Sequence, residues 1–284
     1  HDFPDALAAS SLAGIYDSPV ILTEKETLTS QARDTIGALD ATKVLIIGGE
    51  AVVSNEVADS LKALEGITEV KRIAGEDRFN TALDIYREGR ESTGGWSDTA
   101  IIANGFNFAD ALSVSPFANA TRSPIFLSTP TSRANPGLDT ATLTALTEGG
   151  FKKVIITGGT AAVQALVEDQ LASTGVTIER WSGDTRYETS VDIVKNSLAN
   201  SNGALSLNNL VCATGDNYPD ALAGGAFAGH TGTVLLLVHS TETGGLSGLD
   251  LISEHKDEIG KGYVLGGAAA VPQELLTRLQ EGAK

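Results

Sequence analysis

The sequence of 284 residues contains one cysteine and no methionine. A single cysteine excludes an intrachain disulfide framework. Cys212 lies in the apolar run 210–213, so we expect a buried and unreactive thiol there. There is no initiator methionine, and no signal-peptide pattern is visible. Because the chain also opens inside a repeated motif, we interpret it as a fragment of a longer, processed or trimmed polypeptide.

Long apolar runs are absent, and none approaches the roughly 20 residues that a membrane-spanning helix needs. The sequence therefore predicts no membrane insertion. Basic residues are outnumbered, with 20 Lys and Arg against 36 Asp and Glu, which gives a formal net charge of −16. Such a chain repels nucleic acid and anionic lipid in bulk, so neither is expected as a partner. Solubility explains the acidity most simply, and an acidic surface also suits an extracellular or salty setting.

Metal-binding and cofactor-binding patterns are also lacking. Neither a dinucleotide-binding glycine fingerprint nor a P-loop lysine is present. The few histidines have no metal-ligand spacing, and they fall at unrelated positions of the repeat described below: His1, His230, His239 and His255. Trp96 and Trp181 do not recur either, so neither predicts a repeated platform for stacking sugars. We expect no metal and no cofactor.

What the sequence does contain is a stretch that occurs three times. Each copy has an aromatic residue, then Pro or Ala, then Asp-Ala-Leu, and then a run of small residues. The three aspartates are Asp5, Asp110 and Asp220, at separations of 105 and 110 residues. A fixed period is typical of a repeat architecture. It predicts three similar subdomains, with bounds at residues 1–71, 72–179 and 180–284.

Short apolar strands alternate with amphipathic helices throughout the chain. Runs such as 44–47 and 154–156 are apolar without interruption, which is typical of strands buried on both faces of a parallel sheet. Residues 18–23 predict one more such strand, and the spacing of Leu28, Ala32, Ile36 and Leu39 predicts a helix. The fold class is therefore α/β, with three tandem small subdomains. Each has a short parallel sheet flanked by helices, and the three suggest a pseudo-threefold arrangement.

A pair of glycines follows a predicted strand in each repeat: Gly48 and Gly49, Gly158 and Gly159, Gly266 and Gly267. Glycine permits positive φ and a close approach of the backbone. The helix N-terminus behind the pair is a place where an anion can bind. These six glycines are candidate ligand-binding residues. The alternative is a tight turn between strand and helix.

A second motif, Arg-x-x-Gly-x-x-Arg, occurs at Arg72 and Arg78 and again, 108 residues later, at Arg180 and Arg186. Two arginines around a glycine turn can form a fork for phosphate or carboxylate, so these four are candidate ligand-binding residues. The alternative is an internal ion pair, with Asp77 or with the aspartate of the Asp-Ala-Leu stretch.

The repeated aspartates themselves are poor candidates for catalysis. Glycoside hydrolysis uses a pair of carboxyl groups, but no second carboxylate and no histidine recurs beside Asp5, Asp110 and Asp220. We predict a structural role for them in helix capping or ion pairing, and no catalytic residue. The small residues that follow let helices approach closely. This helix is therefore the candidate contact between the repeats.

Taken together and in order, these motifs resemble the cell wall binding repeat 2 family. The matching pattern is Arg-x-x-Gly-x-[Asp/Thr]-Arg-[Phe/Tyr]-x-Thr, then [Phe/Tyr]-[Pro/Ala]-Asp-Ala-Leu, then Val-x-Ile-x-Gly-Gly, and it covers essentially the whole chain. The resemblance implies a secreted protein of the bacterial or archaeal cell surface. It implies a non-catalytic module that anchors surface-layer proteins, autolysins or adhesins to the wall, often through an anionic secondary polysaccharide.

The sequence departs from this pattern in two places. The first repeat lacks its Arg-x-x-Gly-x-x-Arg segment, and Thr233 stands where Pro19 and Pro124 stand in the other repeats. The acidic charge also fits an anionic polymer poorly, unless local arginines outweigh it or the ligand is a neutral glycan of the peptidoglycan layer. Two alternatives stay open: a structural or adhesive module that assembles with other surface-layer proteins, and an enzyme that acts on wall glycan.

Overall fold

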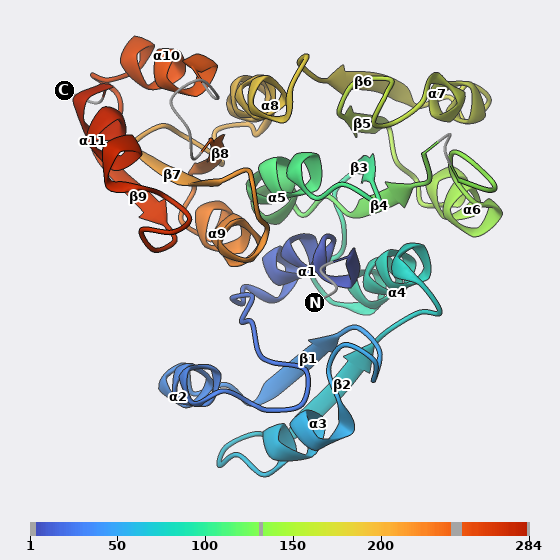
Figure 1. The fold of residues 1–284 in the computed structure, drawn as a ribbon. Coiled ribbons are helices and arrows are strands. Elements are labelled where there is room, and N and C mark those ends of the chain that lie inside the picture. The colour runs from blue at the N-terminus through green and yellow to red at the C-terminus, as the bar shows by residue number, and fades with distance from the viewer. Residues whose placement is uncertain (1–3, 131–132, 240–245, 283–284) are drawn as a thin grey trace.

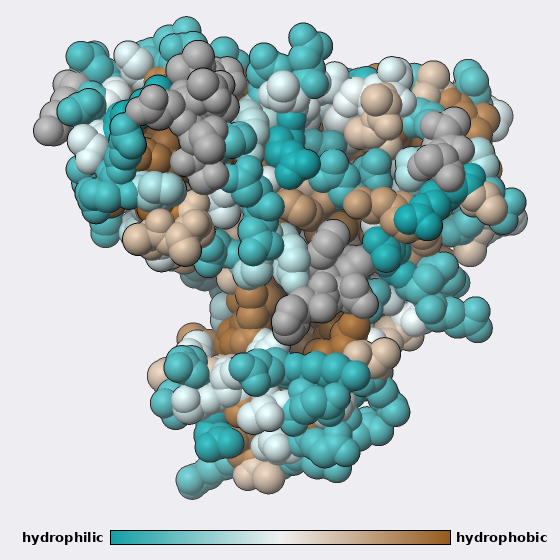
Figure 2. Space-filling model, viewed as in Figure 1, coloured by the Kyte–Doolittle hydropathy of each residue, from teal (hydrophilic) through white to brown (hydrophobic). Residues whose placement is uncertain are grey.

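The computed structural model describes residues 4–130, 133–239 and 246–282, so the first residues of the first Asp-Ala-Leu copy lie outside the described part. The chain forms three lobes around a central group of helices, and each lobe holds a small sheet (Figure 1). Every strand pairing in these sheets is parallel. The predicted α/β class with three tandem subdomains is confirmed. In the space-filling view most of the visible surface is polar (Figure 2).

The first lobe carries the smallest sheet, in which β1 pairs with β2. Ser54 is the N-cap of the helix that follows it, because its side chain accepts a hydrogen bond from the Val57 backbone N–H. The elements of the lobe are α2 (Ser30–Ala38), β1 (Lys43–Ile47), α3 (Asn55–Lys62) and β2 (Glu69–Ile73).

The second lobe has the largest sheet, with strand order β4-β3-β5-β6. Its elements are β3 (Thr99–Asn104), β4 (Ile125–Ser128), α6 (Thr140–Glu148), β5 (Lys153–Thr157), α7 (Ala165–Leu171) and β6 (Thr177–Trp181). The third lobe has the order β8-β7-β9. Its elements are β7 (Asn209–Thr214), β8 (Val234–Val238), α10 (Leu246–Glu254), β9 (Lys261–Leu265) and α11 (Gln273–Gly282).

Three helices, one from each repeat, meet at the centre of the molecule (Figure 1). They are α1 (Ala9–Tyr16), preceded by a short 3-10 turn η1 (Pro4–Ala6), α5 (Ala109–Thr121) and α9 (Pro219–His230). Small residues let them approach closely: a Cβ atom added to Gly14 would lie 2.8 Å from the Asn119 Cα atom, and one on Gly229 would lie 2.7 Å from the Pro116 carbonyl oxygen. The helix after Asp-Ala-Leu is the contact between the repeats, as the sequence predicts.

Two further helices connect neighbouring lobes. Helix α4 (Arg78–Glu91) leads from the first lobe to the second and packs on α1 and β4. Helix α8 (Arg186–Asn200) leads from the second lobe to the third and packs on α5 and β8. The two helices occupy equivalent places in the pseudo-threefold arrangement.

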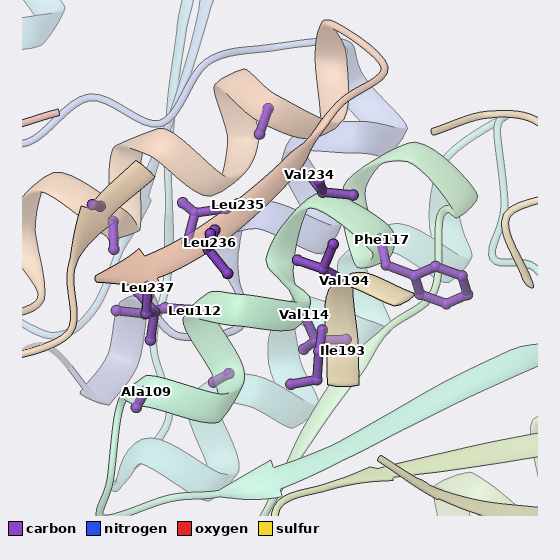
Figure 3. Packing of buried hydrophobic residues seen from close by; sticks show 14 of the residues in the cluster. Ala109, Leu112, Val114, Phe117, Ile193, Val194, Val234, Leu235, Leu236 and Leu237 are labelled. Carbon is purple, nitrogen blue, oxygen red and sulfur yellow. The ribbon is translucent and has the colours of Figure 1, made fainter. Parts of the chain in front are cut away.

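Each sheet has two faces: one faces a hydrophobic core that the lobes share at the centre of the molecule, and the other faces a hydrophobic core within its own lobe. On β3, Ile101 and Ala103 face the shared core, whereas Ala100 and Ile102 face a cluster within the second lobe, as the alternation of side chains along a strand requires. Side chains from α5, α8 and β8 gather in the shared core (Figure 3). Cys212 is buried there, and burial raises the pKa of its thiol to about 12, so it is the unreactive group that the sequence predicts.

Two expectations from the sequence are wrong. Residues 18–23 form no strand, although the equivalent segments in the other lobes are β4 and β8. Those strands pair with β3 and β7, and the described residues of the first lobe contain no equivalent neighbour for 18–23. Leu39 is 50% exposed because α2 ends at Ala38, before this residue could join the buried face of Leu28, Ala32 and Ile36.

The strands β2 and β6 are not predicted from the sequence. Each begins a sequence repeat but pairs with the sheet of the preceding lobe, where Arg72 aligns with Ile46 and Arg180 aligns with Ile156. The second and third repeats thus each contribute to two lobes, and the bounds 1–71, 72–179 and 180–284 stay a prediction of the sequence period. Within the described residues, no helix has the length and apolarity to cross a membrane.

Candidate functional site

The glycine pairs form tight turns at the carboxyl ends of β1, β5 and β9. Gly48, Gly158 and Gly266 have φ angles of 107°, 98° and 111°, a conformation that side chains other than glycine rarely adopt. The expected helix N-terminus does not lie at the pair, since α3 begins only at Asn55. The residues between form a turn in which the Gly49 carbonyl accepts hydrogen bonds from the N–H groups of Val52 and Val53, both at 3.0 Å.

The aspartates of the Asp-Ala-Leu stretches lie against these turns. A Cβ atom on Gly48 would lie 3.2 Å from Asp5 Oδ2, and one on Gly266 would lie 2.7 Å from Asp220 Oδ2. Asp110 lies against Gly158 in the same way. A carboxylate of the protein itself thus occupies the space beside each turn where the sequence suggested a bound anion.

Asp110 also connects the second and third lobes. It is 6% exposed, and burial raises the pKa of its carboxyl to about 6 although the nearby charge of Arg186 lowers it. Arg186 is the second arginine of the motif and lies near enough to influence this carboxyl; that the two groups form an ion pair stays a prediction. The influence runs between repeats, from α5 of one to the start of α8 of the next.

The first arginine of each motif bonds to backbone carbonyls. Arg72 Nη1 donates to the Gly48 carbonyl oxygen at 2.8 Å. Arg180 Nη1 donates to the carbonyl oxygens of Gly158 at 2.7 Å and Val163 at 2.9 Å. The motif therefore ties the strands β2 and β6 to the glycine turn of the preceding lobe. It brings the predicted arginines and glycines together, through contacts within the protein.

The second arginine of each motif bonds at the carboxyl end of the next strand. Arg78 Nη1 donates to the Gly105 carbonyl oxygen and Arg186 Nη1 to that of Gly215, each at 2.7 Å. Asp77, which the sequence suggests as an ion-pair partner, instead caps α4 by accepting hydrogen bonds from the N–H groups of Phe79 and Asn80.

An arginine–aromatic surface lies at these strand ends; we use this name for Arg78, Phe106, Arg133, Phe108 and Arg186. The guanidinium carbons of Arg78 and Arg133 lie 4.5 and 4.4 Å from the centre of the Phe106 ring. That of Arg186 lies 5.4 Å from the centre of the Phe108 ring. These distances fit cation–π contacts. In open α/β sheets, ligands commonly bind outside the carboxyl ends of the strands.

A polar cluster continues the surface in the third lobe and is not predicted from the sequence. Tyr187 donates a hydrogen bond to Asp216 Oδ1 at 2.7 Å, and its ring lies 5.0 Å from that of His239. Burial, and then the bond to the Asp216 carboxylate, raise the pKa of Tyr187 well above its usual value. Asp216 and His239 stand outside every repeated motif, so repeat analysis gave no signal for them. Among the residues that the structure describes, no group of three or more His, Cys, Asp and Glu side chains could hold a metal ion.

Comparison with known proteins shows the family to which this chain belongs. The family model described as Cell wall binding domain 2 (CWB2) matches residues 1–58, 72–168 and 180–276, which is most of the chain. The chain belongs to this family. It is a cell-wall binding module built from three tandem repeats.

Two curated relatives come from Bacillus subtilis (strain 168). The N-acetylmuramoyl-L-alanine amidase LytC is 30% identical over 237 residues, which are 84% of this chain and 43% of the relative. The amidase enhancer is 31% identical over 236 residues, which are 83% of this chain and 30% of the relative. The chain thus spans less than half of each of them.

Two solved structures share the fold. Cwp6 from Clostridium difficile superposes with a TM-score of 0.82 at 22% identity, over 99% of this chain and 42% of that one. Cwp8 from the same organism gives a TM-score of 0.79 at 24% identity, over 99% of this chain and 45% of that one.

Proposed function

We propose that this module holds a secreted protein at the cell surface by binding an anionic secondary polysaccharide of the wall along the arginine–aromatic surface. The observation that carries the proposal is that the guanidinium groups of Arg78 and Arg133 both lie over one ring, that of Phe106, at 4.5 and 4.4 Å from its centre. A guanidinium group that lies over a ring can still direct N–H donors at acidic groups, and the half-buried rings of Phe106 and Phe108 suit the faces of sugars.

Arg133 is the residue of this surface that is best placed to meet a ligand. It is exposed and lies in the loop between β4 and α6. Arg72 and Arg180, by contrast, direct donors into the glycine turns. We therefore assign these two, together with the six glycines and the three aspartates, to support of the binding surface, and Arg78, Arg133 and Arg186 to ligand contact.

The net charge of −16 opposes an anionic polymer at long range. Screening at physiological ionic strength limits that repulsion to a distance of about 8 Å. Arginines that contact the polymer directly lie inside this distance. The proposal therefore predicts binding that depends on local arginines and persists in moderate salt.

The experiment is sedimentation of the chain with purified cell walls, before and after extraction of the anionic secondary polymers. The variant Phe106→Ala with Arg133→Ala removes one ring and one exposed guanidinium group. We expect binding to weaken by about tenfold, which corresponds to about 1.4 kcal/mol. Arg87→Ala is the matched control, since Arg87 is 61% exposed on α4 and pairs with Asp84. Unchanged binding of the double variant would refute the assigned surface.

The relatives named as an amidase and an amidase enhancer suggest what such a module accompanies. Because this chain spans less than half of each relative, we propose that it serves as the anchoring part of a longer surface protein whose activity lies elsewhere. Amidase assays on wall glycan test this division: the chain alone should retain wall binding and show no turnover. Turnover by the chain alone would favour the enzyme hypothesis.

A further inference from the structure

The second and third lobes have the same backbone frame where their strands end. Arg78, at the start of α4, donates to the Gly105 carbonyl oxygen after β3 at 2.7 Å. Arg186, at the start of α8, donates to the Gly215 carbonyl oxygen after β7 at the same distance. Each of these glycines also donates its N–H to the last residue of the neighbouring strand, β4 or β8, at 3.0 and 2.9 Å. Side chains at matching positions of the two frames can therefore be compared directly.

Three positions of this frame differ in chemistry between the two lobes. In the second lobe they hold Phe79 in the first turn of α4, Phe106 after β3 and Thr129 after β4. The ring centres of Phe79 and Phe106 lie 5.9 Å apart. In the third lobe the polar cluster takes the same three positions, in the order Tyr187, Asp216 and His239. Groups that form hydrogen bonds thus replace a pair of apolar rings.

The fold does not require these polar groups. The second lobe keeps the frame with Phe79 and Phe106, whose side chains neither donate nor accept conventional hydrogen bonds. In the third lobe the Tyr187 hydroxyl donates to Asp216 Oδ1 at 2.7 Å, and His239 Nε2 lies 3.8 Å from the same oxygen. Polar groups cost free energy when they are withdrawn from water. The polar cluster therefore indicates a role beyond support of the frame.

The carboxylate of the cluster is accessible from solvent. The side chain of Asp216 is 39% exposed and that of His239 is 28% exposed, whereas Tyr187 is buried. The hydrogen bond from the buried Tyr187 orients the carboxylate. A carboxylate can accept about four hydrogen bonds, and a partly exposed one can accept them from a ligand in place of water. The cluster is therefore placed to contact a ligand.

The mixture of donors and acceptors in the cluster matches hydroxyl groups. Each sugar hydroxyl both donates and accepts hydrogen bonds, as a tyrosine hydroxyl and a neutral imidazole do. Hydrogen bonds from a hydroxyl to a carboxylate, such as that of Asp216, are among the short and strong ones. An ammonium group only donates, so it gives the donors of Tyr187 and His239 no partner. A carboxylate or phosphate group only accepts, and the charge of Asp216 repels it.

The polar cluster adjoins the arginine–aromatic surface. Arg186 directly precedes Tyr187, and its guanidinium carbon lies 5.4 Å from the centre of the Phe108 ring. The Phe108 ring in turn lies 6.0 Å from that of Tyr218, two residues after Asp216. Figure 1 shows α5 and α8, which begin beside these residues, between the second and third sheets. A ligand that follows the strand ends from the second lobe to the third therefore passes from arginines to a carboxylate.

We propose that the polar cluster is a subsite for a neutral hexose unit, whose hydroxyl groups donate to Asp216 and exchange hydrogen bonds with His239. The arginines beside it take an acidic group, so the two places together select a polymer in which a neutral hexose neighbours an acidic group. The selection of such a polymer rests on the proposed function, whereas hexose binding by the cluster is tested without the polymer.

The test is titration of the whole chain with the methyl glycosides of glucose, galactose and mannose, followed through the imidazole signals in NMR spectra. The chain has four histidines, and the variant His239→Thr assigns the signal of His239 by its loss. We expect at least one glycoside to shift this signal with a Kd in the millimolar range. Methyl glucuronide, which carries a carboxylate, should bind at least about tenfold more weakly than that glycoside.

Two variants test the roles of the cluster residues. Asp216→Asn keeps an acceptor for Tyr187 at an exposed position but removes the charge, so glycoside binding should weaken by about tenfold. Tyr187→Phe places the residue type of Phe79 in the same frame, so the chain should fold normally. Because the carboxylate then loses the bond that orients it, glycoside binding should weaken here too. Unshifted signals of the other histidines check the fold of both variants.

The outcomes separate this subsite from the arginine–aromatic surface. The variant Phe106→Ala with Arg133→Ala should bind the glycoside as the unchanged chain does. If that variant also keeps full wall binding, the arginine–aromatic surface is refuted while the hexose subsite stands. The hexose subsite is overturned by any of three results: no glycoside shifts the His239 signal, the glucuronide binds as tightly as the best glycoside, or Asp216→Asn leaves glycoside binding unchanged.

Discussion

Replacement of Gly14 by alanine tests the close contact of α1 with α5. An added Cβ atom would lie 2.7 Å from the Asn119 carbonyl carbon and 2.8 Å from its Cα atom, and closer still to the carbonyl oxygen. These are backbone atoms, so no side-chain rotation relieves the clash. Overpacking costs about 1–3 kcal/mol, and we take the upper end here. The helix propensity of alanine offsets about 1 kcal/mol.

We therefore expect Gly14→Ala to lower the free energy of unfolding by about 2 kcal/mol. In urea titration this moves the midpoint down by about 0.7 M if the slope is about 3 kcal/mol/M. Gly37→Ala is the matched control. Gly37 lies in α2 with no atom within 4 Å of an added Cβ, so the same substitution should raise the unfolding free energy by about 0.5–1 kcal/mol. Equal midpoints for Gly14→Ala and the unchanged chain would refute the close helix contact.

Three further changes test the charged contacts. Glu88 is 6% exposed; burial acts to raise its pKa, but the hydrogen bonds from Lys71 and Tyr16 outweigh burial and lower the pKa from 4.5. Glu88→Gln should cost about 1–2 kcal/mol of unfolding free energy near pH 7. Because the native carboxylate stabilises the fold above pH 4.5, the difference should shrink as the pH falls through the lowered pKa; a constant difference would argue against the ion pair. Burial raises the pKa of Asp110 from 3.8 to about 6, so its penalty is absent below pH 3.8 and grows as the pH rises to about 6. Asp110→Asn should match the unchanged chain in acid and exceed its stability by up to about 3 kcal/mol above pH 6, as measured by thermal unfolding across pH. Arg180→Ala removes two hydrogen bonds to carbonyls and the contact with Glu168, and should cost about 2 kcal/mol in urea unfolding. If Arg180→Ala unfolds normally but loses wall binding, Arg180 is a ligand residue after all.

The sequence was sufficient to predict the threefold period, the α/β class and the helix contact, because each depends on local features that recur. Gly48 illustrates this, since glycine readily adopts the positive φ that this turn requires. Arg72 illustrates the limit. Its partner Gly48 lies in the preceding repeat, and only the pairing of β2 with β1 brings the two together. From the sequence alone, the two arginines of the motif are therefore predicted to bind a ligand, because their partners within the protein are not evident.

The polar cluster of Tyr187, Asp216 and His239 shows a second limit. Its residues come from three separate places: Tyr187 from the start of α8, Asp216 from the segment after β7, and His239 from the segment after β8. A search for repeats passes over features that occur once. The same holds for Arg133, which reaches Phe106 from a loop that no repeat motif includes.

Residues 18–23 show a third limit. Their composition matches that of β4, which is a buried strand, but a strand also needs hydrogen-bond partners on a neighbouring strand. The local sequence indicates which segments can form a strand, but whether a strand forms depends on a neighbouring strand that supplies hydrogen-bond partners.

The most direct test of the account is sedimentation of the chain with purified walls at physiological salt, compared before and after extraction of anionic secondary polymers. Wall binding through such a polymer predicts that the chain sediments with intact walls and stays in solution with extracted walls. Purified polymer, when added back, should compete for the chain. Equal sedimentation with both wall preparations would contradict the account and direct attention to the peptidoglycan glycan itself.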